Sequence, residues 1–265
     1  MNQITISFIG AGNIGGALIQ AISNLNKGYV IKAYDVSEKA MRRAESMFAI
    51  GCGSIREVAS HTDIVIMAVK PQYYNEVIEE LRDAMEPNTI VISLAPGWGV
   101  SLLKEKLGAE RRIVRAMPNT PAQVGEGMSA VAFSHDAYTA DEKNAVLDIF
   151  RGAGHVIEVR EEMMDAVMAL SGCAPAYGYI FIEALGDIGT ALGLPRATCY
   201  ELAAQTLLGA SKMVLESGKH PGELKDMVCT PGGTTIQGVM ALEESGFRNA
   251  IIQAVAATYR KAKEL

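Results

Sequence analysis

The chain has 265 residues, enough for one large domain or two ordinary ones. Hydrophobic residues make up 49% and charged residues 20%, a composition typical of a globular protein that buries a sizeable core. The net charge of −6 is spread along the sequence without a basic run, so it indicates neither nucleic-acid binding nor attachment to a membrane surface.

Other features of the sequence argue against a membrane protein and a metal protein. The longest apolar stretches, such as Ile64 to Val69, have the length of a strand and are far too short to span a bilayer. The N-terminal sequence MNQITISFIG lacks the basic and long apolar regions of a signal peptide. The four cysteines are scattered and form no CxxC, and the four histidines show no metal-ligand spacing. We therefore expect a cytoplasmic protein with reduced thiols, no membrane contact and no metal.

The first 160 residues alternate short apolar runs with amphipathic segments. Near-continuous apolar strands separated by helices are typical of a parallel sheet covered on both faces. The pattern predicts an α/β domain over residues 1–160, with a Rossmann-type, doubly wound, mostly parallel sheet. The predicted strands are Ile4–Ile9, Val30–Tyr34, Ile64–Val69, Thr89–Leu94, Arg112–Ala116 and Ser129–Phe133. The clearest predicted helices are Ile14–Asn24 and Glu38–Ala49.

A glycine-rich turn, GAGNIG at residues 10–15, follows the first predicted strand and opens the first predicted helix. In a GxGxxG pattern the first glycine permits a tight turn, the second lets the backbone approach a pyrophosphate, and the third allows close helix–strand packing. Glycine-rich turns also recur for structural reasons, but this position favours dinucleotide binding at the helix N-terminus. The predicted cofactor contacts here are Ile9, Gly10, Ala11, Gly12, Asn13, Ile14 and Gly15.

Asp35 stands at the end of the second predicted strand, where an acidic residue bears on the choice of cofactor. A carboxylate at this place usually accepts hydrogen bonds from the adenosine ribose and repels a 2′-phosphate, which favours NADH over NADPH. Asp35 can alternatively be a cap for the helix that begins near Ser37. Three nearby cations can still attract a phosphate: Lys39, Arg42 and Arg43.

A second predicted cofactor turn, Ala68-Val69-Lys70-Pro71, lies at the carboxyl end of the third predicted strand. Such strand ends line the ligand crevice of a doubly wound sheet. Lys70 can be interpreted as a catalytic base, but we favour a role in which its backbone and Pro71 shape the crevice wall. Ala95 and Asn119, which follow later strands, complete the predicted cofactor contacts.

From about Glu161 the strand-like runs stop and long helical patterns begin. Pro195 suits a first helical position, and Gly193, Gly218 and Gly246 suit helix ends. The predicted helices are Glu162–Leu192, Pro195–Ser217, Thr234–Glu244 and Phe247–Glu264.

The first two of these helices are apolar on more than one face. Their glycines Gly172, Gly178, Gly186 and Gly189 each cost roughly 1 kcal/mol relative to alanine, which favours a role in close helix–helix contact. A small domain with so much apolar helical surface is expected to bury part of it against another subunit. We therefore expect residues 161–265 to form an obligate homodimer; a compact monomeric bundle is the alternative.

The segment Thr230-Pro231-Gly232-Gly233-Thr234-Thr235 precedes the helical run IQGVMALEE. Two glycines expose backbone N–H groups, two threonines add hydroxyls, and a helix N-terminus attracts an anion. These properties indicate a cradle for a carboxylate. A glycine-rich turn with a threonine N-cap is the alternative interpretation.

Several motifs in register resemble the pyrroline-5-carboxylate reductase family over nearly the whole chain. They are GAGNIGGAL, AVKPQ, MPNTPAQVGEG (117–127), SGCAPAY (171–177) and KDMVCTPGGTTIQG (225–238). The resemblance implies a Rossmann-type domain followed by an interlocked helical dimerisation domain, with dimers that can assemble into larger rings. It also implies NADH- or NADPH-dependent reduction of 1-pyrroline-5-carboxylate to proline.

The resemblance further implies roles for particular residues. The backbone from Gly233 through Thr234 to Thr235 would hold the substrate carboxylate, and Thr235 would lie near the ring nitrogen as the catalytic candidate. Glu161 matches a family position that contacts the product, although it can also be a helix N-terminal charge; Asp165 is a weaker candidate of the same kind. Hydride transfer to the C=N carbon needs mainly positioning, so no strong acid or base is required.

Two departures from the family keep other interpretations open. The family usually has SGSGPAY where this chain has Cys173 and Ala174, and many relatives prefer NADPH although Asp35 favours NADH. A β-hydroxyacid dehydrogenase is disfavoured because no lysine occurs between Lys143 and Lys212. A related imine reductase with a different cyclic imine, or a non-catalytic NADH-binding regulatory protein, are the remaining alternatives.

Overall fold

The computed structural model describes residues 3–264 and divides them into two compact units. Ala174–Ala257 forms the second unit, and the rest of the described chain forms the first. The predicted domain boundary lies between residues 160 and 161. The division into compact units instead falls after Cys173, so that the segment from Glu161 to Cys173 belongs to the first unit. The boundary between the functional domains stays a prediction.

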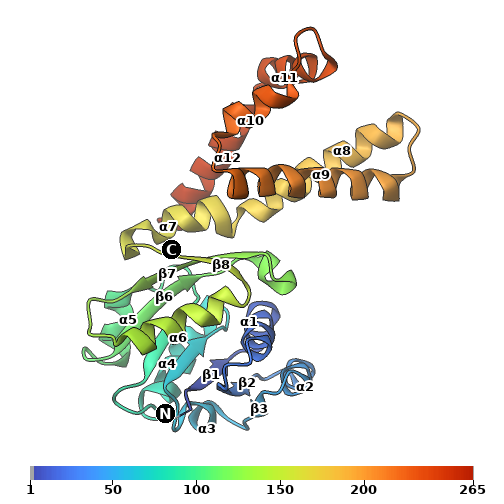
Figure 1. The fold of residues 1–265 in the computed structure, drawn as a ribbon. Helices are drawn as coiled ribbons and strands as arrows, with labels where there is room; N and C mark the ends of the chain where they lie inside the picture. Colours follow the sequence, from blue (N-terminus) through green and yellow to red (C-terminus); the bar gives the residue numbers. More distant parts are fainter. Residues whose placement is uncertain (1–2, 265) are drawn as a thin grey trace. The chain divides into compact units, whose positions relative to one another are not determined.

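The first unit is built on an eight-stranded sheet with strand order β3-β2-β1-β4-β5-β6-β7-β8 (Figure 1). Every neighbouring pair is parallel except β6 and β7, which run antiparallel. The order reverses at β1, which lies between β2 and β4, as in doubly wound sheets. The strands are β1 (Thr5–Ile9), β2 (Val30–Tyr34), β3 (Ile50–Gly51), β4 (Ile64–Met67), β5 (Ile90–Ser93), β6 (Arg112–Met117), β7 (Gly127–Phe133) and β8 (Gly154–Glu158).

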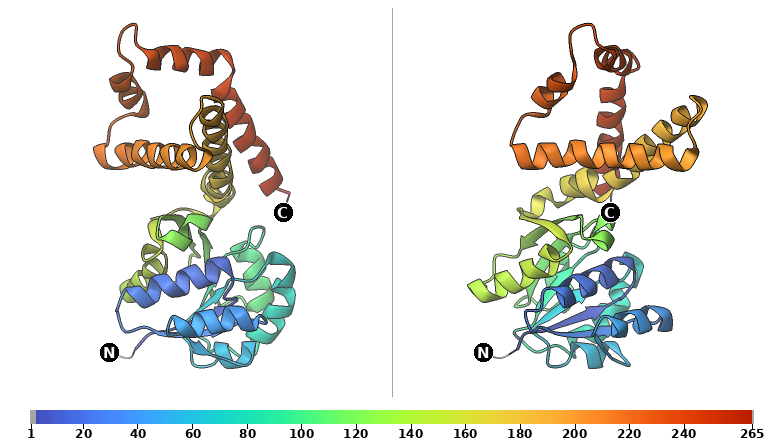
Figure 2. Two further views of the ribbon diagram at one scale, coloured as in Figure 1. Left: turned by 90° about the vertical axis from the view of Figure 1, so that its right-hand side faces the viewer. Right: turned by 45° about the vertical axis from the view of Figure 1, so that its right-hand side comes forward.

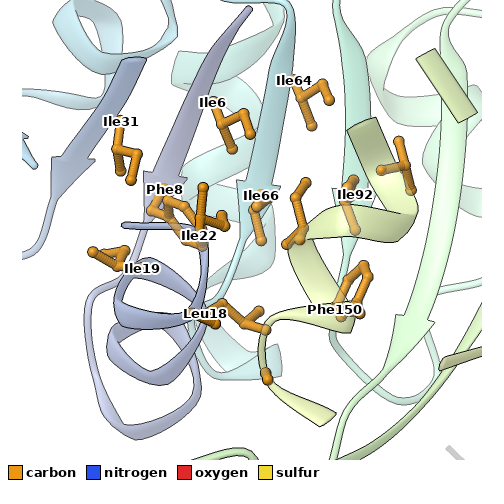
Figure 3. Packing of buried hydrophobic residues seen from close by; sticks show 14 of the residues in the cluster. Ile6, Phe8, Leu18, Ile19, Ile22, Ile31, Ile64, Ile66, Ile92 and Phe150 are labelled. Atoms are coloured by element: carbon orange, nitrogen blue, oxygen red, sulfur yellow. The ribbon is translucent and has the colours of Figure 1, made fainter. Parts of the chain in front are cut away.

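Helices cover both faces of this sheet. One buried cluster joins the sheet to α1, α2 and α6, and Figure 3 shows Phe8, Leu18 and Phe150 within it. A second cluster joins the opposite face to α3, α4 and α5. Alternate strand residues therefore enter different cores, which explains why the central strands are apolar at almost every position. These helices are α1 (Asn13–Asn24), α2 (Glu38–Ser46), α3 (Ile55–Ala59), α4 (Tyr74–Arg82), α5 (Val100–Leu107) and α6 (Ala140–Arg151); short 3₁₀ turns are η1 (Pro71–Tyr73) and η2 (Thr120–Val124).

The predicted mostly parallel sheet is confirmed, and all six predicted strands are present with shifts of a few residues at their ends. Two strands were not predicted. β3 has only two residues, both exposed, and β8 mixes polar and apolar residues at the edge of the sheet. Edge strands are buried on less of their surface, so their sequences lack the continuous apolar run that marks a central strand.

The second unit contains helices and no strand among its described residues. α8 packs against α9 and the two helices cross, whereas α10 and α11 extend away from this pair (Figure 2). Glycines with positive φ follow the helices at the predicted ends: Gly193, Gly218 and Gly246. The helices are α8 (Ala174–Ala191), α9 (Arg196–Ser217), α10 (Pro221–Val228), α11 (Thr234–Glu244) and α12 (Phe247–Ala262), whose last residues from Thr258 belong to the first unit.

Two of the four glycines predicted to allow close helix packing do so. A Cβ at Gly186 would overlap the Tyr200 ring, and a Cβ at Gly189 would lie 2.7 Å from the Cys199 sulfur, so α8 and α9 approach each other where no side chain intervenes. Within this chain a Cβ at Gly178 would meet nothing within 4 Å, so a close helix contact at Gly178 stays a prediction.

The predicted continuous helix from Glu162 to Leu192 is interrupted. The amide of Cys173 donates to the Met168 carbonyl at 3.0 Å, which gives a π-helical turn immediately before α8. Pro175 explains the interruption, since proline has no N–H to donate and its ring crowds the carbonyl four residues earlier. The segments are η3 (Glu161–Met163), α7 (Met164–Val167) and the π-helical η4 (Met168–Gly172).

The helical stretch Glu161–Ala191 is long and apolar enough to cross a membrane by length and composition, whereas no segment of that kind was predicted from the sequence. Such a test is weak evidence, because an interface helix of a globular protein passes it too. Many large apolar side chains of α8 and α9 are exposed within the single chain, among them Tyr179, Ile180, Ile188 and Leu215. This exposure agrees with the expectation of a subunit interface.

A buried carboxylate connects α6 to the loop before β2. Asp148 accepts hydrogen bonds from Lys27 Nζ at 2.6 Å and from the Tyr29 hydroxyl at 2.8 Å, and its other oxygen lies 3.4 Å from Arg151. Burial alone would raise the pKa of Asp148, but the hydrogen bonds from Lys27 and Tyr29 and the positive charge of Lys27 together lower it. The folded state therefore favours the ionised carboxylate.

Replacing Asp148 by asparagine is expected to lower the free energy of unfolding by about 1.5–3 kcal/mol at pH 7, the range for a hydrogen bond to a charged group. A depressed pKa contributes stability above the unfolded value of about 3.9, and this contribution is lost as the pH falls through the folded value. Urea unfolding of the protein and of Asp148→Asn at fixed protein concentration should thus differ at pH 7 and converge below pH 4. An equal difference at both pH values would contradict this assignment.

Candidate functional site

A cavity of about 480 Å³ in the first unit lies beyond the carboxyl ends of β1, β2 and β4. Ligands of doubly wound sheets bind at this point, where the strand order reverses. The cavity is lined by Ile9, Gly10, Gly12, Tyr34, Asp35, Val36, Ile55, Ala68, Val69, Lys70, Tyr73, Glu76, Val77 and Glu80.

The three glycines of the first turn have different structural roles. Gly10 has φ of +100°, and a Cβ there would lie 2.8 Å from the Ala68 backbone, so only glycine fits. A Cβ at Gly15 would overlap the Gly10 carbonyl. A Cβ at Gly12, by contrast, would meet nothing within 4 Å and would point into open space at the cavity. Gly12 is therefore the glycine that keeps room for a ligand.

The N-terminus of α1 is open toward an anion. Gly12 is the N-cap residue, and among the described residues no side chain caps this helix or places an acidic group in its first turn. The first N–H groups of a helix and its dipole attract a negative charge. An open Gly12 at an uncapped helix start fits a pyrophosphate.

Asp35 is held in place by two backbone groups. Its Oδ2 accepts a hydrogen bond from the Ala11 amide at 2.7 Å, and its Oδ1 accepts one from the Ser37 amide at 2.8 Å. The N-cap of α2 is Ser37, whose side chain accepts from Ala40, so the alternative role of Asp35 as the cap of α2 is wrong. Asp35 instead connects the glycine turn to the end of β2 and lines the cavity.

Two of the three nearby cations are engaged by other groups. Arg43 Nη2 donates to the carbonyl oxygens of Ala11 (3.0 Å) and Gly12 (2.5 Å), and Arg42 pairs with Glu38 at 3.2 Å. Arg43 therefore stabilises the glycine turn through its carbonyl oxygens. The bond that Asp35 accepts from Ala11 and the bonds that Arg43 donates leave the loop with little freedom.

One wall of the cavity was not predicted from the sequence. It comes from η1 and α4, where Tyr73, Glu76 and Glu80 lie at i, i+3 and i+7, with Val77 between them. This spacing places them on one face of a helix that follows directly after the AVKP turn, and that signal could have identified them. The wall adds two carboxylates to the cavity that already contains Asp35.

The fourteen predicted cofactor residues divide into two groups of seven. Ile9, Gly10, Gly12, Asp35, Ala68, Val69 and Lys70 line the cavity. Ala11, Asn13, Ile14, Gly15, Pro71, Ala95 and Asn119 do not line it. The side chain of Asn119 is engaged by the protein, since its Oδ1 accepts from the Met128 amide at 2.9 Å and its Nδ2 donates to the Ser171 carbonyl at 3.1 Å. Asn119 thus shapes the backbone around it.

Glu161 has internal partners in the first unit. Its Oε1 accepts from the Val100 amide at the start of α5 at 2.7 Å, and it lies 3.3 Å from the guanidinium of the largely buried Arg115. The sequence raised the possibility of a helix N-terminal charge, and the structure shows that role at α5 rather than at the helix that follows Glu161.

The segment predicted to form the carboxylate cradle lies in the second unit. The Gly233 amide donates to the Thr230 carbonyl at 3.0 Å, with Pro231 and the positive-φ Gly232 between them, as in a type II turn. Gly233 is the N-cap of α11, and within the described chain no side chain caps this helix. The threonine N-cap alternative is therefore wrong, and the Thr234 and Thr235 side chains are exposed beside the open helix start.

The described residues contain no group of three or more His, Cys, Asp or Glu side chains arranged to hold a metal ion. The four cysteines are free thiols.

Comparisons with known proteins cover both units. Residues 161–265 match the model of the pyrroline-5-carboxylate reductase dimerisation family, and residues 5–97 match the family described as NADP oxidoreductase coenzyme F420-dependent. Pyrroline-5-carboxylate reductase of Escherichia coli is 41% identical over 98% of this chain and 97% of that protein.

Solved structures give the same result. A pyrroline-5-carboxylate reductase from Coxiella burnetii has a TM-score of 0.91 and 35% identity, covering 99% of this chain and 98% of the other. The Plasmodium falciparum pyrroline carboxylate reductase, solved with NADP bound, has a TM-score of 0.87 and 34% identity over 99% of both chains.

The contrast between the glycines gives a test of the cavity. Gly12→Ala is expected to change the melting temperature by no more than about 2–4 °C, equivalent to about 1 kcal/mol, because its methyl group meets no protein atom. The same methyl group should weaken NADH binding at least about tenfold, or 1.4 kcal/mol, by occupying ligand space.

Fluorescence titration with NADH and thermal unfolding measure the two effects. Gly15→Ala is the control, since its methyl group would overlap the Gly10 carbonyl and should destabilise the fold itself. Wild-type NADH affinity in a stable Gly12→Ala protein would show that the ligand does not approach this turn.

Proposed function

Since this chain belongs to the pyrroline-5-carboxylate reductase family, we propose how its residues carry out the family reaction, the NAD(P)H-dependent reduction of 1-pyrroline-5-carboxylate to proline. The main support for the reaction is the 41% identity with the Escherichia coli enzyme over 98% of the chain. The two sites described above supply the parts that the reaction needs, a dinucleotide cavity and a cradle for a carboxylate.

The cavity of the first unit is the proposed dinucleotide site. The open side of Gly12 and the uncapped start of α1 would receive the pyrophosphate, and Asp35 would accept hydrogen bonds from the adenosine ribose. The turn from Ala68 to Pro71, with Ala95, would shape the adjoining wall. The bound cofactor supplies the hydride, and the protein supplies its position.

NADH is the proposed preferred cofactor. Asp35 cannot swing away from the ribose without breaking its bonds to Ala11 and Ser37. Arg42 and Arg43 are engaged elsewhere, so they are poorly placed to neutralise a 2′-phosphate. The carboxylates of the α4 wall add to the repulsion of a phosphate dianion.

The α11 N-terminus is the proposed substrate cradle. The backbone amides from Gly233 to Thr235 would bind the carboxylate of the ring, and the Thr235 hydroxyl would lie at the ring nitrogen. Glu161 is a further proposed substrate contact; its Oε1 is already used by Val100 and Arg115, so only Oε2 would serve.

The chemical step places modest demands on the protein. A hydride adds to the carbon of the C=N bond and the nitrogen keeps or receives one proton, which together give proline. Donor and acceptor must come within roughly 3–3.5 Å, so positioning provides most of the rate enhancement. Thr235 or water can deliver the proton, and no group needs to act as a strong acid or base.

The dimerisation match and the exposed apolar helices of the second unit support a homodimer. We propose that dimers can associate further into a ring and that the enzyme is cytoplasmic, in agreement with four free thiols. Reduction of a different cyclic imine is the remaining alternative, because Cys173 and Ala174 replace the usual small residues before α8.

Thr235→Val, which removes only the hydroxyl, is expected to lower kcat/KM for 1-pyrroline-5-carboxylate about 10- to 100-fold. Loss of a hydrogen bond to a charged group costs about 1.5–3 kcal/mol, which corresponds to this range. The rate of NADH oxidation measures the effect, and NADH affinity should stay unchanged. Thr198→Val removes a hydroxyl from α9 in the same unit and serves as the control. Equal activity of the Thr235 and Thr198 variants would reject the proposed cradle.

Asp35→Asn is expected to reduce the ratio of the Kd values for NADPH and NADH about three- to tenfold. The repulsion between one carboxylate and a phosphate dianion about 5–6 Å apart in water is on the order of 1 kcal/mol after screening. Glu79→Gln removes the same charge from an exposed position of α4 that does not line the cavity, and it should leave the ratio unchanged. A wild-type protein that binds NADPH more tightly than NADH would refute the preference.

A further inference from the structure

Tyr74, the first residue of α4, has a fully buried side chain and a hydroxyl with four polar neighbours. The hydroxyl donates to the Met67 carbonyl at 2.8 Å and accepts from the amides of Leu94 at 3.2 Å and Ala95 at 3.1 Å. Ser93 Oγ lies 3.3 Å away. A phenol has one proton and two lone pairs, so the Met67 carbonyl takes the proton, and the two amides and Ser93 Oγ share the lone pairs.

These backbone groups belong to the carboxyl ends of two adjacent strands. The parallel ladder of β4 and β5 ends at the pair Met67 and Ser93, and beyond it the Leu94 amide reaches the Met67 carbonyl only at 3.4 Å. The Tyr74 hydroxyl lies where the two strands separate and bonds to both. The hydroxyl thus takes the place of the next backbone hydrogen bond between β4 and β5.

The segments that follow this fork form part of the proposed dinucleotide site. Ala68, Val69 and Lys70 directly follow Met67 and line the cavity, and Ala95 is a predicted cofactor contact. Tyr74 does not line the cavity and therefore cannot touch a ligand there. Any effect of its hydroxyl on ligand binding must act through the positions of these two turns.

We propose that Tyr74 is a positioning residue whose hydroxyl sets the spacing of the β4–η1 and β5–α5 turns and so prepares the cavity for the dinucleotide. This inference rests on the proposed cofactor site. Phenylalanine would remove the hydroxyl that accepts from the Ala95 amide and would leave the Leu94 amide only its long, 3.4 Å bond to the Met67 carbonyl, so both amides would have to move toward better acceptors. Burial raises the pKa of Tyr74 to about 12, so the hydroxyl stays protonated at neutral pH and keeps donating to Met67.

Tyr74→Phe tests the proposal against Tyr138→Phe, which removes the hydroxyl of a half-buried tyrosine that also bonds to the backbone. Tyr138 also has a pKa raised to about 12 by burial, and its hydroxyl donates to the Ile113 carbonyl at 3.0 Å, but it does not line the cavity and bonds to the start of β6. Both variants should lose thermal stability. Only Tyr74→Phe should raise the NADH Kd and the NADH KM, by about tenfold, with the KM for 1-pyrroline-5-carboxylate unchanged.

The single tryptophan gives a spectroscopic signature of the same change. Trp98 lies on the β5–α5 turn, and its ring centroid is 4.9 Å from that of Tyr74. Its emission should shift in Tyr74→Phe and stay as in the wild type in Tyr138→Phe. A folded Tyr74→Phe protein with NADH Kd and Trp98 emission like the wild type would overturn the proposal, since the hydroxyl would then be only a stability element.

If Tyr74→Phe fails to fold, Ser93→Ala decides the question. It removes only the fourth neighbour of the hydroxyl and should raise the NADH Kd two- to threefold; an unchanged Kd would reject the positioning role. The proposed cofactor site fails separately, namely if the wild type binds neither NADH nor NADPH or if Gly12→Ala binds NADH normally.

Discussion

The contact between two backbones, at Gly10 and Ala68, is the constraint on which the first unit depends. A Cβ on Gly10 would lie 2.8 Å from the Ala68 carbonyl carbon and oxygen. Only a glycine at this position therefore allows the chain to turn from β1 into α1. The same close approach brings the start of α1 against the end of β4, at the point where the strand order of the sheet reverses. An uncapped helix N-terminus, two strand ends and an open Gly12 thus meet in one place, and the cavity is a consequence of this packing.

Polar side chains around the cavity act mainly on the backbone. Asp35 holds the Ala11 amide, Arg43 holds the carbonyls of Ala11 and Gly12, and Tyr74 joins the ends of β4 and β5. Each of these groups satisfies backbone atoms that a turn would otherwise leave without partners. The loops are therefore ordered by the protein itself, so the conformational entropy of ordering them is lost during folding and binding does not have to offset it again.

Much of this arrangement could be predicted from the sequence. The central strands are buried on both faces and appear as apolar runs in the sequence. The glycine turn lies between the first strand and the first helix, which is the position typical of a dinucleotide-binding turn. The edge strands, the α4 wall and the partner of Glu161 could not be predicted in the same way. Tyr73, Glu76 and Glu80 have helical spacing, but only the fold shows that this face borders the cavity, and the contact between Glu161 and Val100 joins residues far apart in sequence. Such pairings depend on tertiary packing, which local periodicity does not encode.

The second unit follows a different physical logic. In the part of the chain that the structure describes, α10 and α11 have no buried residue, although α11 supplies the proposed cradle. A helix of eleven residues is marginal in water without packing from other elements. The dimerisation match covers this region, so a second copy is the natural source of the missing packing. In the first unit, packing against the sheet fixes the start of α1 at Gly12. Burial between subunits would fix the start of α11 at Thr235 in the same way, so that each helix N-terminus could bind an anion. On the proposed cradle, oligomerisation and substrate binding would both depend on one set of exposed apolar helices.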